Sequence, residues 1–141
     1  MRKFMKTSMA MALLGLGAAS AHAELVVIVN PQNPAESLTS DQLAAIYLGN
    51  TSSFPGGGQA VPADRPESSP SRDVFYQKVT GRSASQVKAV WARLVFTGKG
   101  IPPKELKSDA DVKAFVAANP KAIGYVDSSA VDSSVKVAFK L

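Results

Sequence analysis

The run Leu25–Val29 is the feature that most constrains the fold of this chain. Its five residues, Leu-Val-Val-Ile-Val, are all apolar and mostly β-branched, with no polar residue between them. A strand of this kind is buried on both faces, so its sheet needs covering elements on both sides. Two prolines in Asn30–Pro34 end the strand, because proline cannot extend a hydrogen-bonded ladder.

Helical patterns follow the first strand. Thr39 with Gln42 and Ser83 with Gln86 have the spacing of capping boxes, which mark helix starts. Gly49 and Gly81 are placed to end helices. The predicted helices are about 40–48, 71–80, the amphipathic segment after Ser83 (Val87, Val90, Trp91, Leu94, Val95), and a segment that begins at Ser108 and ends at Asn119-Pro120.

Further strands are expected between and after these helices. The sequence predicts a short strand or edge at 59–62, a strand at 122–126 and a half-exposed terminal strand at 135–141. Residues 64–70 are expected to form a polar loop, and 127–134 a turn with room for one helical turn. Because helices connect the strands, we expect an α/β domain with a small mixed or mostly parallel sheet of about four or five strands.

The first 23 residues have the organisation of a secretory signal peptide. Arg2, Lys3 and Lys6 precede a short apolar run, and Ala21-His22-Ala23 is typical of a cleavage site. We therefore expect a signal peptide at 1–23, one domain at 24–141, and a periplasmic product, with secretion into the medium left open. The remaining 118 residues would carry 13 basic and 11 acidic side chains, a scattered charge that predicts neither nucleic-acid binding nor membrane insertion.

The absence of histidine and cysteine after residue 23 limits the chemistry. The single histidine is His22, and the chain has no cysteine. This excludes Ser-His-Asp and Cys-His catalysis, thiol chemistry and His/Cys metal sites, so we expect no enzyme, metal or cofactor, although a Ser-Lys hydrolase is not excluded. Asp109 and Asp111 are two residues apart and do not share a helix face, which favours interaction with the helix dipole over acid-base catalysis.

The segment 64–75, Asp-Arg-Pro-Glu-Ser-Ser-Pro-Ser-Arg-Asp-Val-Phe, is the strongest candidate for a binding site. Ser69 before Pro70 indicates a helix start, where free backbone N–H groups and the helix dipole attract anions. Hydroxyls and two guanidinium groups could add donors, and the expected anion site contains Arg65, Ser68, Ser69, Ser71 and Arg72. The alternative is ordinary helix capping, with Arg65 paired to Glu67 or Asp64.

Several motifs in order resemble one family. Leu38–Gly49 (Leu-Thr-x-x-Gln-Leu-x-x-Ile-Tyr-Leu-Gly), a Gly-rich loop at 56–58, Arg65, the serine-rich helix start and Ala122-Ile-Gly-Tyr-Val126 are similar to phosphate-binding proteins of ABC transporters, in the PBP-like superfamily. Trp91 and Phe96-Thr-Gly98 also fit. The resemblance covers nearly all of 24–141 and implies one lobe of a type 2 periplasmic binding fold.

The resemblance also implies roles for individual residues. Arg65 corresponds to the phosphate-binding arginine of the family, Ser69 to its serine and Ser71 to its threonine. Ser68 and Pro70 replace glycines, and Pro70 removes a backbone donor. Arg72 stands where the family often has a second threonine, and it could restore positive charge.

The chain resembles only one of the two lobes that clamp the ligand in this family. Three charge-assisted hydrogen bonds contribute roughly 5–9 kcal/mol, whereas association costs about 4–15 kcal/mol. A lone lobe is therefore expected to bind phosphate or a similar oxyanion weakly, with a Kd around millimolar or higher. A homodimer or an envelope protein partner could supply the missing wall, and the alternative function is a protein-protein interaction module with a vestigial anion site.

The aromatic side chains are expected to lie in the core rather than in a site. Their spacing matches the apolar faces of the predicted helices and strands. The expected core aromatics are Tyr47, Phe75, Trp91, Phe96, Phe115 and Tyr125.

Overall fold

The computed structural model describes residues 24–141. The predicted signal peptide, residues 1–23, lies outside the described residues. Among the residues that are described, no helix is both long enough and apolar enough to cross a membrane.

The centre of the domain is a mixed sheet of five strands in the order β3-β2-β4-β1-β5. β1 pairs antiparallel with β4 and β5, whereas β2 pairs parallel with β3 and β4. The strands are β1 (Leu25–Val29), β2 (Val61–Asp64), β3 (Lys104–Glu105), β4 (Ala122–Asp127) and β5 (Lys136–Lys140). The predicted fold class, a small mixed sheet with flanking helices, is confirmed.

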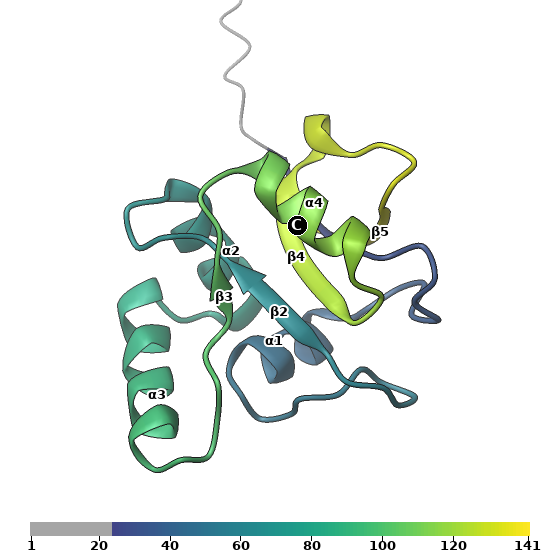
Figure 1. The fold of residues 1–141 in the computed structure, drawn as a ribbon. Coiled ribbons are helices and arrows are strands. Elements are labelled where there is room, and N and C mark those ends of the chain that lie inside the picture. Colours follow the sequence, from purple (N-terminus) through teal and green to yellow (C-terminus); the bar gives the residue numbers. More distant parts are fainter. Residues whose placement is uncertain (1–23) are drawn as a thin grey trace, which may run out of the picture.

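Helices cover both faces of the sheet, as the apolar run of β1 requires. Val27 and Val29 face the core beneath α1 (Ser40–Tyr47) and α2 (Pro70–Thr80). Val26 and Ile28 alternate to the opposite face and pack with α4 (Asp109–Ala118). Figure 1 shows α4 on one side of the sheet and α1 and α2 on the other. All five residues of β1 are buried.

The predicted helix boundaries follow from their caps. The capping boxes of Thr39 with Gln42 and Ser83 with Gln86 are both formed, and they begin α1 and α3 (Ala84–Phe96). Gly81 ends α2 in the left-handed region at φ 70°, a conformation that glycine adopts without strain. Ser108 caps α4 by accepting from the N–H of Asp111.

An aromatic cluster forms the centre of the core beneath α1 and α2. Tyr47, Phe75 and Tyr125 are buried as predicted. Tyr76 joins them, and the rings of Phe75 and Tyr125 stack with centroids 4.0 Å apart. Trp91 packs at the edge of this core and donates its indole N–H to the carbonyl of Tyr47 at 2.8 Å.

Three predictions from the sequence need correction. The strand predicted at 59–62 lies at 61–64, so Asp64 is a buried strand residue and not part of a polar loop. The short strand β3 was not anticipated, because two exposed residues carry no apolar alternation. Phe96 is 92% exposed rather than buried, because α3 stands beside the sheet and buries only Val87 fully (Figure 1).

One further element lies in the predicted turn. A single 3-10 turn, η1 (Ser128–Ala130), connects β4 toward β5, within the segment where the sequence left room for one helical turn.

Candidate functional site

The junction between β2 and α2 carries the residues that the sequence singles out. Arg65 directly follows β2, and Ser69 precedes α2 as its N-cap, with Pro70 at the start of the helix as predicted. The Ser69 backbone is extended at the cap, at φ −80° and ψ 121°, but its side chain makes no capping hydrogen bond. The Ser69 hydroxyl is therefore not used to begin the helix. Ser71 is half-buried and Ser68 is exposed.

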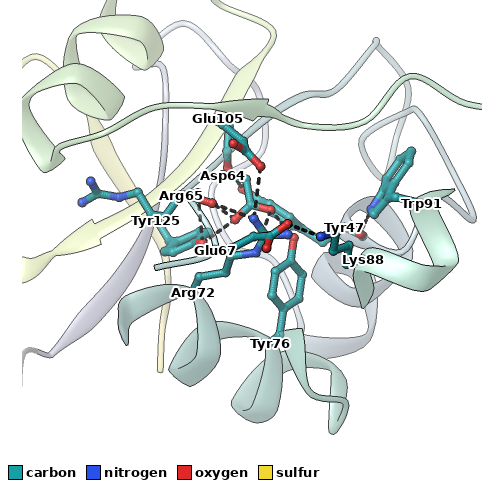
Figure 2. Close-up of polar contacts among 11 residues, drawn as sticks. Tyr47, Asp64, Arg65, Glu67, Arg72, Tyr76, Lys88, Trp91, Glu105 and Tyr125 are labelled. Carbon is teal, nitrogen blue, oxygen red and sulfur yellow. Dashed lines mark hydrogen bonds and ion pairs between the residues drawn. The ribbon is translucent and has the colours of Figure 1, made fainter. Parts of the chain in front are cut away.

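A buried carboxylate, that of Asp64, organises this junction. Its Oδ1 accepts the O–H of Tyr125 at 2.5 Å and the backbone N–H of Arg65 at 2.8 Å. Its Oδ2 accepts the O–H of Tyr76 at 2.5 Å (Figure 2). Burial raises the pKa of Tyr76 and of Tyr125, and the Asp64 charge raises both further. The network links β2, α2 and β4, and so fixes the backbone from which the Arg65 side chain extends.

Arg72 extends from α2 into the same network. Its Nη1 donates to the backbone carbonyl of Arg65 at 2.9 Å and to Glu105 at 3.2 Å. Its Nε lies 3.9 Å from Oδ2 of Asp64. Burial alone would lower the pKa of Arg72, but the Asp64 carboxylate, the hydrogen bond to Glu105 and the neighbouring tyrosines together outweigh burial, and the pKa is raised. Arg72 is therefore a charged, buried support of the junction, and is only 6% exposed.

Arg65 points away from Arg72 (Figure 2). Its guanidinium donates through Nη2 to Oδ1 of Asp109, the first residue of α4. Neither partner considered from the sequence pairs with the Arg65 guanidinium. From Arg65, Asp64 accepts the backbone N–H alone, and Glu67 pairs with Lys88 at 2.6 Å. The contact with Lys88 lowers the pKa of Glu67. The structure thus brings the two arginines to the same backbone segment but directs their guanidinium groups to different carboxylates.

Both arginines have a donor left over. The Nε atoms of Arg65 and Arg72 are buried and have no hydrogen-bond partner. A buried N–H without a partner is uncommon and costs free energy, so each marks a place where an acceptor would be favourable.

A cavity of about 460 Å³ opens beside the start of α2. Asp64, Glu67, Arg72, Lys88 and Glu105 form its polar side. Its other wall is apolar and comes from α3 and the segment that follows it: Trp91, Ala92, Val95, Phe96, Pro102 and Pro103. The cavity therefore joins a charged region, with nearly balanced signs, to an apolar surface.

Part of that apolar wall is open to solvent, and so is Ile101, which directly precedes Pro102 of the wall. Phe96 is 92% exposed and Ile101 is 88% exposed, and half of Val95 is open to solvent. Exposed apolar side chains that gather at one place are typical of contact surfaces.

Within residues 24–141, no group of three or more His, Cys, Asp or Glu side chains is placed to hold a metal ion.

A family model described as PBP superfamily domain matches residues 19–139. The chain belongs to the PBP superfamily. No curated protein is significantly similar to it.

This PBP domain is similar to solved structures of phosphate-transport proteins. A protein of Clostridium perfringens, assigned as a phosphate ABC transporter substrate-binding protein and solved with bound phosphate, is 27% identical with a TM-score of 0.67. An ABC-type phosphate transport receptor of Vibrio cholerae is 25% identical with a TM-score of 0.63. The matches cover 82% of this chain but only 44% and 45% of those two chains. The chain therefore spans less than half the length of these relatives and matches one lobe of the fold.

The sequence did not show which carboxylates contact the two arginines, although it offered Asp64 as a possible partner of Arg65. Asp64 was assigned to a loop, and Asp109 was assigned only to the helix dipole. An aspartate that directly precedes an arginine at the end of a strand was the available signal for Asp64. Nothing in the local sequence indicates that Asp109, 44 positions after Arg65, lies beside it.

Proposed function

We propose that this chain is an exported, non-catalytic oxyanion-binding protein, with phosphate as its ligand and a substrate-binding role in ABC transport. The observation that carries the proposal is the match to the phosphate-bound structure from Clostridium perfringens, together with the serines and arginines at the start of α2. Export would depend on residues 1–23 and would place the protein in the periplasm.

The proposed ligand groups are Arg65, Ser68, Ser69, Ser71 and Arg72. The start of α2 offers backbone N–H groups and the positive end of the helix dipole. The Ser69 hydroxyl is not consumed by capping, and each arginine has an unpartnered Nε. Pro70 has no backbone N–H, so the start of α2 has one hydrogen-bond donor fewer than it would have with glycine at this position. These features favour binding of an anion, although this site has fewer hydrogen-bond donors than one with glycine in place of Pro70.

One lobe on its own should bind phosphate weakly. A few charge-assisted hydrogen bonds barely exceed the cost of association, so we expect a Kd around millimolar for the chain alone. A second copy or an envelope protein that covers the start of α2 would add donors and exclude water, and would tighten binding.

The proposal is tested by following backbone amide shifts of ¹⁵N-labelled protein during addition of phosphate at low salt. We expect saturable shifts at 69–75, and their loss in Arg65→Ala. Arg82→Ala is the matched control, because Arg82 is exposed and lies beyond the end of α2. Equal shifts in wild type and Arg65→Ala would remove Arg65 from the site.

The exposed apolar surface supports a second candidate function, a protein-protein interaction module with a vestigial anion site. Phe96 lines a cavity that reaches the start of α2, and the exposed Ile101 directly precedes Pro102 of the same cavity wall. On this alternative, Phe96→Ser abolishes association with a copy or an envelope partner in sedimentation and pull-down experiments, while phosphate has no effect. A wild-type protein that stays monomeric and captures no partner argues against it.

A further inference from the structure

The contact between Arg65 and Asp109 closes the proposed ligand's access to Arg65. The Arg65 side chain is only 7% exposed, whereas the Asp109 side chain is 33% exposed. Asp109 is thus the member of the pair that meets solvent. A negatively charged oxygen of Asp109 already lies where an oxyanion would approach this arginine.

Asp109 satisfies Arg65 incompletely. The Nη2 and Nε groups of an arginine lie on one edge and form two parallel donors, which suit two oxygens of a carboxylate or phosphate. Asp109 accepts from Nη2 through Oδ1, but its Oδ2 is directed to the backbone N–H of Asp127 at 3.4 Å. The Nε of Arg65 is left buried without a partner. The Asp109 carboxylate therefore accepts from one of the two donors on this edge of the Arg65 guanidinium.

We propose that Asp109 is an intramolecular competitor of the oxyanion, and that it must leave Arg65 before phosphate binds there. This inference rests on the proposed function. An ion with two oxygens on the Nη2–Nε edge would satisfy both donors, which the Asp109 carboxylate does not. Competition of this kind lowers the apparent affinity for every anion and favours those that bind in a bidentate manner.

The position of Asp109 allows it to leave. It is the first residue of α4, and Ser108 caps this helix without help from Asp109. A released Asp109 carboxylate stays near the positive end of the helix and gains water, which limits the cost of its displacement. Its neighbour Asp111 is also in the first turn, but it is exposed. Asp111 is therefore a matched control with the same charge and the same helix dipole.

The test compares phosphate affinity of wild type, Asp109→Asn and Asp111→Asn by amide shifts at one low salt concentration. Removing the competing charge should lower the Kd of Asp109→Asn by roughly tenfold or more, the effect of one charge-assisted contact. Asp111→Asn should match wild type. A Kd for Asp109→Asn that equals or exceeds the wild-type value overturns the proposal, as does an equal decrease in both variants.

A measurement on wild type covers the case in which Asp109→Asn does not fold. The ¹³C resonance of the Asp109 carboxyl should move as phosphate saturates the amides at 69–75, and an unmoved resonance contradicts displacement. The two proposals fail in different ways. If neither wild type nor Asp109→Asn responds to phosphate, the binding function itself is wrong. If wild type binds and Asp109→Asn binds no better, only the competitor is wrong.

Discussion

Replacing Asp64 by alanine removes the acceptor of three buried donors. These are the hydroxyls of Tyr76 and Tyr125 and the backbone N–H of Arg65. Each buried donor without a partner costs about 1–3 kcal/mol, so Asp64→Ala should lose roughly 3–9 kcal/mol. That loss is comparable with the whole stability of a domain this size, about 5–15 kcal/mol.

Urea unfolding followed by the fluorescence of Trp91, the only tryptophan, measures this loss. Asp64→Asn keeps an acceptor oxygen and should lose less than Asp64→Ala. Asp73→Ala is the control, because Asp73 is an exposed acid in the first turn of α2 and its removal should cost only about 0.3–1 kcal/mol. A loss in Asp64→Ala no larger than that of Asp73→Ala would refute the role of Asp64 as the organiser of the junction.

Three further predictions concern stability. Burial raises the pKa of all three tyrosines, whereas unfolded tyrosine ionises near pH 10, so stability should fall as pH rises above about 10 and tyrosinate absorbance should appear only with unfolding. Gly124→Ala would place a Cβ 2.5 Å from Cγ1 of Val112. This substitution should lower the free energy of unfolding, measured by urea denaturation, by about 1–3 kcal/mol. Ser69→Ala should leave the melting temperature nearly unchanged because Ser69 makes no cap bond, whereas Ser83→Ala should cost about 1 kcal/mol; equal losses would contradict this.

Local signals were sufficient for most of the fold. Residues close together in sequence determine these elements, so they could be predicted locally. Examples are the apolar run of β1, the capping boxes of α1 and α3, and the glycine after α2. The exposure of Phe96 could not be predicted in this way. Helical spacing shows which side chains share a face, but not whether another element covers that face.

The site was harder to predict than the fold because its contacts join distant positions. The sequence indicated an arginine beside a helix start, and the structure places Arg65 and Ser69 there. The partners of the arginines come from β3 and α4, at Glu105 and Asp109. A salt bridge between residues far apart in sequence leaves no local pattern. Its presence decides whether the guanidinium donors of an arginine are available to a ligand or already bonded to a carboxylate.

Titration of the ¹⁵N-labelled protein with phosphate at low salt, with sulfate in parallel, tests the central claim most directly. One lobe with the start of α2 as its anion site predicts saturable shifts that are largest at 69–75, with a Kd around millimolar. Amides in this segment that stay unmoved at phosphate concentrations of about ten times that value, or shifts that rise without saturation across the surface, would contradict it.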